Sequence, residues 1–383
     1  MTSLSRRDAL AMALALASAG VARGEPRRPS LDSLAKAKGL TFGSNLGGGP
    51  PGTRKGTFSD PRYQQVMIAE CGALVPENEL KWQALRPGPD TFAFERADAL
   101  IGFGEAHGMA IRGHTLLWHR SKWFPDWLNK HDFGAHPAAE AERLLTTHIR
   151  TVCGRYGPRI KSWDVVNETV MPDTGLMPDT VFSKHLGPQV IDIAFHTARE
   201  AAPHALLVYN DYMSWGAGDE THRSGVLKLL ERLKASGVPI DALGVQGHIG
   251  PDSDGPAAKV SVQESEWRRF IDEVVGMGYR LLITEMDVND IDLPADPAVR
   301  DRMIADYTGG YLDLMLSYPQ LGTVMTWGMV DSYSWLQDRL ARTDHLPKRP
   351  LPYDAAFQPK PMREAIAAAF RAAPARTPLG VRA

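Results

Sequence analysis

The sequence predicts a single-domain α/β fold, a (β/α)8 TIM barrel, because short apolar stretches alternate with amphipathic segments through most of the chain. Eight apolar stretches of strand length begin near Phe42, Ala73, Ile111, Trp163, Ala205, Leu243, Leu281 and Thr323. Their mean spacing is about 40 residues, the length of one strand–helix unit with generous loops. Nearly continuous apolar strands of this kind indicate a parallel sheet that helices cover.

The intervening segments carry apolar residues at helical spacing, most clearly in residues 138–155, 220–236 and 301–318. The main alternative, an open doubly wound sheet, usually has a glycine-rich phosphate-binding turn after its first strand. Here the first strand is followed by Gly47-Gly48-Gly49-Pro50-Pro51, which fits neither the GxGxxG nor the GKS/T pattern. Eight units without such a turn favour the closed barrel.

The composition is that of an ordinary globular protein, with 383 residues of which 43% are hydrophobic and 23% charged. The formal net charge of −2 argues against nucleic acid or an anionic membrane surface as a partner. Barrels commonly use this much chain in one domain, and no linker leads to an added module. We therefore predict a monomer with one domain over residues 31–373 and a frayed tail at residues 374–383.

The N-terminus has the features of an export signal. Arg6 and Arg7 precede a weakly hydrophobic run, residues 9–21, that is too short to span a bilayer. A twin arginine at this place indicates a Tat-type signal peptide over residues 1–24, and the alternative is a Sec signal. Either signal predicts a mature protein that is exported to the periplasm or secreted, with no membrane-spanning segment.

The two cysteines, Cys71 and Cys153, fall late in two predicted helices that are not consecutive. We expect two free, buried thiols rather than a disulfide, because a buried cysteine behaves as a small apolar residue and these helices are not expected to be neighbours.

Polar and aromatic residues gather where the predicted strands end, which is where barrel enzymes carry their chemistry. Strands four and seven each end in a glutamate, Glu168 and Glu285. The strand ends and the loops just beyond them also supply carboxylates, amides, imidazoles, indoles and one lysine: Glu77, Asn78, Lys81, His114, Trp118, Asn167, Gln246, His248, Asp287, Trp327 and, in the loop after strand eight, Trp335. Amides and carboxylates suit sugar hydroxyls, and indoles suit the flat faces of pyranose rings. The set predicts a neutral, polyhydroxylated ligand.

Several of these residues have simpler interpretations. We assign Trp82 to packing. Glu79 fits the role of an ion-pair partner, and Asp164 fits that of a structural cap or barrel residue. His114 and His119 do not have the spacing of a metal pair, and no HExxH motif is present, so no metal or cofactor is predicted.

Six motifs in consistent order, between about Leu34 and Phe370, closely resemble the endo-1,4-β-xylanases of glycoside hydrolase family 10. They are Pro76-Glu77-Asn78-Glu79-Leu80-Lys81-Trp82, Arg112-Gly113-His114-Thr115-Leu116-Leu117-Trp118-His119, Trp163-Asp164-Val165-Val166-Asn167-Glu168, Gly244-Val245-Gln246-Gly247-His248, Ile283-Thr284-Glu285-Met286-Asp287 and Thr326-Trp327-Gly328.

The resemblance implies retaining hydrolysis of xylan and xylooligosaccharides, with Glu168 as acid/base and Glu285 as nucleophile. It implies that His248 and Asp287 support Glu285, and that Asn167 bonds the 2-hydroxyl of the attacked sugar. The residues implied to bind or enclose the substrate are Glu77, Asn78, Lys81, His114, Trp118, Gln246, Trp327 and Trp335. We further expect hydrogen bonds from His248 and Gln246 to keep Glu285 ionised.

The sequence departs from the family pattern after Asn210-Asp211-Tyr212, where it continues Met213-Ser214-Trp215-Gly216-Ala217-Gly218. We expect Trp215 to replace the usual contacts to sugars on the leaving-group side. The acidic, Gly/Pro-rich loop at residues 250–260 has no counterpart that we can assign. Three alternatives stay open: a related barrel acting on cellulose, mannan or mixed-linkage glucan, a non-catalytic carbohydrate-binding protein, and a transglycosylase.

Overall fold

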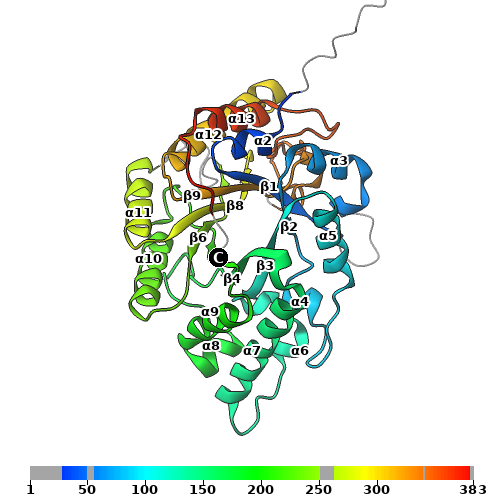
Figure 1. The fold of residues 1–383 in the computed structure, drawn as a ribbon. Coiled ribbons are helices and arrows are strands. Elements are labelled where there is room, and N and C mark those ends of the chain that lie inside the picture. Colours follow the sequence, from blue (N-terminus) through cyan, green and yellow to red (C-terminus); the bar gives the residue numbers. More distant parts are fainter. Residues whose placement is uncertain (1–27, 50–55, 251–262, 340, 380–383) are drawn as a thin grey trace, which may run out of the picture. The chain divides into compact units, whose positions relative to one another are not determined.

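Eight parallel strands close into a barrel, as the sequence predicts (Figure 1). The computed structural model describes residues 28–49, 56–250, 263–339 and 341–379. The barrel strands are β1 Thr41–Leu46, β2 Ala73–Pro76, β3 Ala110–Trp118, β4 Ile160–Asn167, β5 Leu206–Asp211, β6 Ala242–Val245, β8 Arg280–Val288 and β9 Leu321–Thr326. Neighbours in sequence pair in parallel around the ring, and the pairings of β1 with β9 and of β6 with β8 close it. A short additional strand, β7 His248–Ile249, pairs with the end of β8.

Helices surround the strands in Figure 1. They are α2 Leu31–Lys36, α3 Pro61–Glu70, α4 Trp82–Leu85, α5 Glu95–Ala106, α6 Asp126–Asn129, α7 Pro137–Tyr156, α8 Val181–Leu186, α9 Gln189–Ala201, α10 Glu220–Ala235, α11 Glu264–Gly276, α12 Pro297–Leu316 and α13 Pro361–Ala372. The three helices predicted from periodicity correspond to α7, α10 and α12, with ends that differ by a few residues.

Local sequence explains several helix starts. The side chain of Asp60 accepts the Arg62 N–H before α3, and that of Asp296 accepts the Val299 N–H before α12. In both helices a proline follows the capping residue, where its missing N–H costs nothing. Thr180 and Ser183 form a reciprocal capping box at α8.

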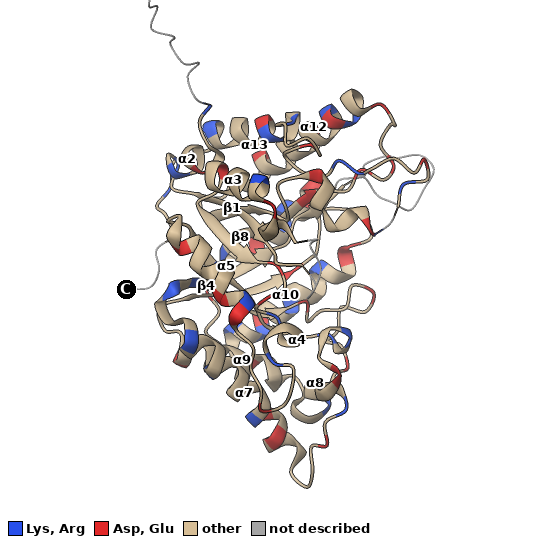
Figure 2. Cartoon of the chain, turned by 90° about the vertical axis from the view of Figure 1, so that its right-hand side faces the viewer, with Lys and Arg blue, Asp and Glu red and all other residues tan. Residues whose placement is uncertain are grey.

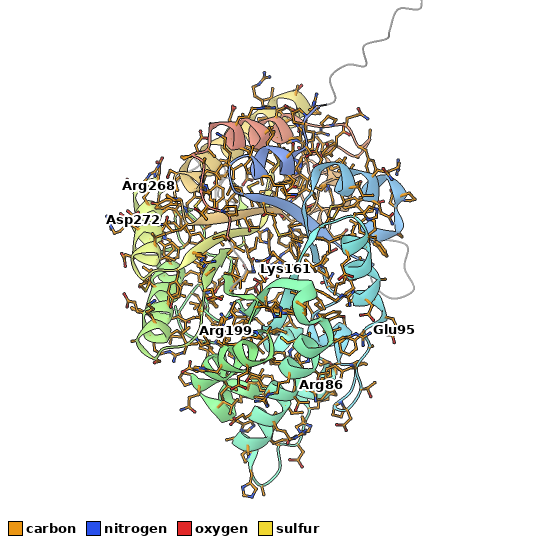
Figure 3. The ribbon with its side chains drawn as sticks, in the orientation of Figure 1. Arg86, Glu95, Lys161, Arg199, Arg268 and Asp272 are labelled. Carbon is orange, nitrogen blue, oxygen red and sulfur yellow. The ribbon has the colours of Figure 1, made fainter. Side chains whose placement is uncertain are left out.

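The strands are buried on both faces, and their outward side chains form the main core with the helices. Acidic and basic residues are mixed along the outer helices in Figure 2. Figure 3 places Arg268 and Asp272 of α11 in this outer layer. No helix among the described residues is long and apolar enough to cross a bilayer. Cys71 and Cys153 are both buried and free, which confirms the prediction of two unpaired thiols.

The predicted frayed tail is wrong for residues 374–379, which contact the barrel. The Arg376 guanidinium donates to the carbonyl oxygens of Leu316, Tyr318 and Leu321 at 2.7, 2.8 and 3.0 Å. Leu379 packs on the apolar cluster Leu206, Val208, Ala242 and Leu282. A Cβ on Gly322 would lie 1.9 Å from Leu379 Cγ, so the glycine makes room for this contact. Residues 380–383 and the predicted signal peptide, residues 1–24, lie outside the described residues.

We expect Arg376→Ala to destabilise the protein, because Arg376 binds the last carbonyl of α12 and two carbonyls beyond it. Hydrogen bonds from a charged donor contribute about 1.5–3 kcal/mol when buried, so this half-buried set should contribute about 1–2 kcal/mol. Urea unfolding measures the change. Arg371→Ala, which removes an exposed arginine from α13, is the control. Equal unfolding midpoints for the two variants would show that the tail does not stabilise the barrel.

Candidate active site

A cleft of about 640 Å³ opens at the carboxyl ends of the strands. It brings together every predicted site residue except Asp287, which lies directly behind it. The lining residues are Glu77, Asn78, Lys81, Gln83, His114, Trp118, Lys122, Trp123, Asn167, Glu168, Tyr212, Ser214, Asp219, Gln246, His248, Glu285, Trp327, Trp335 and Arg339.

Glu168 follows the last residue of β4 in a left-handed backbone conformation, with φ of 55°. Such a conformation costs a non-glycine residue on the order of 1 kcal/mol and is concentrated at functional sites. Its carboxylate accepts the indole N–H of Trp118 at 2.9 Å and the amide N–H of Gln246 at 3.0 Å. Burial raises the pKa of Glu168, and the charges of Asp211 and Glu285 add to this, against the two hydrogen bonds.

Glu285 lies within β8, three residues before the strand ends at Val288, and is only 5% exposed. Its Oε1 accepts the Asn210 amide at 2.8 Å, and its Oε2 lies 3.5 Å from His248 Nε2. Burial alone would raise the pKa of Glu285. A hydrogen bond from His248 and attraction to His114, His248 and Lys81 outweigh burial, so the pKa is lowered. The pKa values of Glu168 and Glu285 are therefore displaced in opposite directions.

The expected donor set of Glu285 needs one correction. Gln246 donates its amide to Glu168, not to Glu285, and Asn210 takes the predicted place. The Gln246 side chain also lies 3.4 Å from Asn167 Oδ1, which in turn accepts from Asn210 at 2.9 Å. A chain of amides thus connects the two acids. In the sequence, Asn210 lies at the end of the fifth predicted strand, but nothing in the residues around it indicates a partner of Glu285.

His248, Asp287 and Trp335 form a second chain of hydrogen bonds behind Glu285. His248 Nδ1 lies 3.0 Å from Asp287 Oδ1, and the Trp335 indole donates to Asp287 Oδ2 at 2.7 Å. Burial would lower the pKa of His248, but the negative charges and hydrogen bonds of Asp287 and Glu285 raise it. A protonated His248 is therefore held between two carboxylates, and Asp287 fixes the orientation of both rings.

Lys81 is a buried cation in the wall of the cleft, 5% exposed. Its Nζ donates to Asn78 Oδ1 at 2.9 Å and lies 4.6 Å from the centre of the Trp118 ring. Burial lowers the pKa of Lys81, against the charges of Glu285 and Glu77. Burial also raises the pKa of Glu77. Lys81, Asn78 and Glu77 thus present several polar atoms beside the face of the Trp118 ring. Such a combination suits the hydroxyl groups of a sugar and the flat face of its ring.

His114 lies against Trp327, with 5.5 Å between ring centres. Its Nδ1 is 2.9 Å from Asp164, which also pairs with Arg112, so Asp164 is a buried anchor for the cleft wall. His119 does not line the cleft. It is buried between the hydroxyls of Thr169 and Thr180, at 2.6 and 2.9 Å, and burial lowers its pKa to about 3. Neither histidine belongs to a group of metal-ligating residues within the described part of the chain.

Two of the simpler interpretations are confirmed. Trp82 is 2% exposed and stacks on His148, with ring centres 3.9 Å apart. Glu79 pairs with Arg96 at 3.1 Å.

The prediction for Trp215 is wrong. Trp215 is 5% exposed, donates its N–H to Tyr307 OH and packs on Tyr311, so it belongs to the core. Loop 251–262 lies outside the described residues. The lining residues that were not predicted are Gln83, Lys122, Trp123, Tyr212, Ser214, Asp219 and Arg339. Trp123 could have been predicted as a lining residue, because it is an indole only five residues beyond Trp118. In the structure the two rings stack, with 4.4 Å between their centres.

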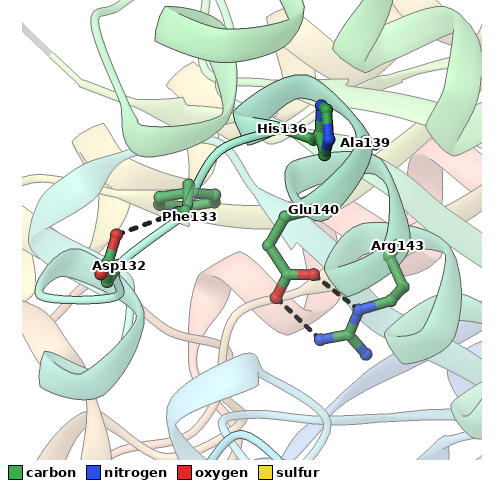
Figure 4. A pocket seen from close by; sticks show the side chains of 7 residues that line it. Asp132, Phe133, His136, Ala139, Glu140 and Arg143 are labelled. Atoms are coloured by element: carbon green, nitrogen blue, oxygen red, sulfur yellow. Dashed lines mark hydrogen bonds and ion pairs between the residues drawn. The ribbon is translucent and has the colours of Figure 1, made fainter.

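A second surface cavity, of about 390 Å³, lies at the loop before α7 (Figure 4). Glu140 and Arg143 pair across one side of it at 2.7 Å. It contains none of the predicted site residues.

Comparison with known proteins agrees with this geometry. The sequence model of the family described as glycosyl hydrolase family 10 matches residues 30–369. Endo-1,4-beta-xylanase 3 of Hypocrea jecorina is 31% identical over 338 residues, which are 88% of this chain and 84% of that protein. Endo-1,4-beta-xylanase B of Thermotoga neapolitana is 29% identical over 80% of this chain and 82% of its own length.

Solved structures of xylanases are also similar to this chain over most of its length. Native xylanase 10B from Thermotoga maritima is 30% identical, with a TM-score of 0.77 over 89% of this chain and 98% of that one. Xylanase 10B from Thermotoga petrophila RKU-1, solved in complex with xylobiose, is 29% identical, with a TM-score of 0.79 over 91% and 98%. The family match covers most of the chain and includes Glu168 and Glu285, so this protein is a glycoside hydrolase that belongs to glycosyl hydrolase family 10.

Proposed function

We propose that this protein is an endo-1,4-β-xylanase that cleaves internal bonds of xylan with retention of anomeric configuration. The observation that carries the proposal is the pair of glutamates in one cleft, Glu285 with a lowered pKa and Glu168 with a raised one. Retaining glycosidases need this division between an ionised nucleophile and a protonated acid.

In the first half-reaction, the Glu285 carboxylate attacks the anomeric carbon while Glu168 gives its proton to the departing glycosidic oxygen. The bond to the leaving sugar breaks, and a glycosyl ester forms on Glu285. His248 and Asn210 hold the attacking carboxylate in place. We infer that Asn167, which is linked to the two acids through Gln246 and Asn210, bonds the 2-hydroxyl of the sugar under attack.

In the second half-reaction, the ester has removed the negative charge of Glu285. Glu168 then loses a repelling neighbour, and its own pKa falls. It can therefore take a proton from water as that water attacks the anomeric carbon and releases Glu285. One carboxyl group thus acts as acid and then as base.

The choice of xylan rests on the two relatives described above that are named endo-1,4-beta-xylanases and on the xylanase 10B that was solved with xylobiose. Xylose lacks the hydroxymethyl group of glucose. Trp335, fixed by Asp287 beside His248, is a bulky ring in a position to exclude that group.

Product analysis on linear xylooligosaccharides and on a panel of polysaccharides tests this proposal. We expect release of short xylooligosaccharides from xylan, with the β anomer formed first in NMR spectra. Faster cleavage of cellulose, mannan or mixed-linkage glucan would overturn the substrate assignment. An early α anomer would overturn the retaining mechanism, and long transfer products in place of hydrolysis would favour a transglycosylase.

The pH profile supplies a mutational prediction. The hydrogen bond from Trp118 favours the ionised form of Glu168, so Trp118→Phe should raise the pKa of Glu168 further. Because Glu168 must be protonated for the first step, the basic limb of the kcat/KM profile should move to higher pH. Trp123→Phe changes an indole of the same cleft that does not bond Glu168, and it should leave that limb in place. A shift to lower pH in Trp118→Phe would contradict the assignment.

We also propose that the protein is exported through its twin-arginine segment and acts as a monomer. Replacement of Arg6 and Arg7 by lysine should hold the protein in the cytoplasm, as cell fractionation would detect. Unchanged export would favour a Sec signal.

A further inference from the structure

Two cations line the cleft without an acidic partner. Lys122 and Arg339 are both exposed, and neither forms an ion pair with a carboxylate among the described residues. Asp219, a half-buried acid of the same lining, accepts the Ser214 N–H at 2.7 Å and pairs with neither cation. Lys81 differs from both, since it is buried and four glutamates act on its pKa. Within the described part of the chain, neither outer cation therefore balances a carboxylate through an ion pair.

Arg339 lies over an aromatic ring of the cleft. Its guanidinium lies 5.1 Å from the centre of the Trp335 ring. Trp335 is fixed in turn by its hydrogen bond to Asp287. A stacked guanidinium still presents its N–H donors around its edge, in the fork geometry that a carboxylate accepts. Arg339 thus offers guanidinium N–H donors that no carboxylate of the described residues occupies, next to a ring that borders the cleavage position.

The main chain of xylan is neutral and gives no reason for such a site. A xylan that carries uronic acid branches has one carboxylate on each branch, and a branch points away from the main chain toward the rim of a cleft. The exposed position of Arg339 at the rim matches that direction. Lys122, a flexible cation above the Trp123 ring at 4.8 Å, lacks the planar fork.

We propose that Arg339 binds the carboxylate of a uronic acid branch on the substrate and makes acidic xylan a preferred substrate. This inference rests on the proposed xylanase function. It assigns Arg339 to the choice among xylans and not to bond cleavage.

The test compares native glucuronoxylan with the same polymer after its carboxyl groups have been reduced to alcohols. The branch keeps its size in the reduced polymer and loses only its charge. We expect the wild-type enzyme to cleave the native polymer with a kcat/KM about threefold higher, the effect of one exposed charged pair. Arg339→Gln should bring this ratio to one, and Arg339→Lys should give an intermediate value. Added salt should lower the wild-type ratio toward one.

Arg302→Gln, which removes an exposed arginine of α12 outside the cleft lining, is the control for net charge and should keep the wild-type ratio. The ratio is taken within each variant, so a general loss of activity cancels. A ratio of one in the wild-type enzyme, or an unchanged ratio in Arg339→Gln, overturns the proposal. If the preference for the native polymer disappears in Lys122→Gln but not in Arg339→Gln, the assignment to Arg339 is overturned. Cleavage of linear xylooligosaccharides, which carry no uronic acid, is measured separately. If the enzyme does not cleave them, the proposed xylanase function is wrong, whatever the ratio between the two polymers.

Discussion

Replacing Glu285 with alanine is expected to abolish xylan hydrolysis, with kcat lowered on the order of 10⁴-fold or more, as found when the nucleophile of a covalent mechanism is removed. Glu285 is 5% exposed and receives the Asn210 amide and the His248 ring, and no other carboxylate of the cleft has these partners. Without it, no group is in place to form the glycosyl ester. Initial rates on xylan measure the loss, and circular dichroism confirms that the barrel still folds.

A small external anion separates loss of the nucleophile from general damage. Azide can occupy the space that the carboxylate leaves and attack the anomeric carbon from the same side. We expect azide to restore turnover in Glu285→Ala with an activated aryl β-xyloside and to give the α-glycosyl azide. Asp219→Ala removes another carboxylate of the same lining and should lose far less activity. A β-azide from Glu285→Ala would contradict the role of Glu285 as nucleophile.

The barrel could be predicted because each of its signals is local. A strand buried on both faces needs a short apolar run, and a covering helix needs apolar residues at 3.6-residue spacing. All eight apolar stretches begin within three residues of a barrel strand in the structure. In a parallel barrel all strands end on the same face, so the polar residues at their ends had to converge. Glu168 and Glu285 followed from this rule together with the family motifs.

Interactions between distant segments could not be predicted in the same way. Gln246 follows β6 and lies between the two acids. Which of them, Glu168 or Glu285, accepts its amide hydrogen bond depends on side-chain rotamers that no local pattern specifies. Trp215 has the composition of a sugar-stacking residue, but Tyr307 and Tyr311 of α12 come close enough to bury it.

The C-terminal segment shows the same limit. Its composition resembles that of a frayed end, and the reason for its order lies elsewhere in the chain. The last carbonyl oxygen of α12, that of Leu316, accepts a hydrogen bond from Arg376, and the space beside Gly322 receives Leu379. The buried pair of Lys360 and Asp331, 2.9 Å apart across 29 residues, likewise leaves no periodic signal in the sequence.

Replacing Glu168 with alanine is expected to have an effect that depends on the leaving group. Cleavage of xylan should fall by about 10²–10⁴-fold, the usual contribution of a general acid, because the departing sugar oxygen needs a proton. An aryl β-xyloside with an acidic phenol leaves without that proton, so formation of the ester on Glu285 should remain fast. The second step still lacks its base. A rapid burst of phenol followed by slow turnover is therefore expected in stopped-flow or quench measurements.

Azide also distinguishes the two glutamates, because they lie on opposite faces of the sugar in the proposed mechanism. In Glu168→Ala the ester on Glu285 still forms, and azide attacks it from the side that Glu168 vacates. The product is then the β-glycosyl azide, opposite to that from Glu285→Ala. Gln246→Ala removes a hydrogen-bond donor to Glu168 but keeps the carboxyl group, so it should show neither the burst nor the azide product. Equal losses of Glu168→Ala on xylan and on the aryl xyloside would contradict its role as acid, because such losses would not depend on the need for a proton.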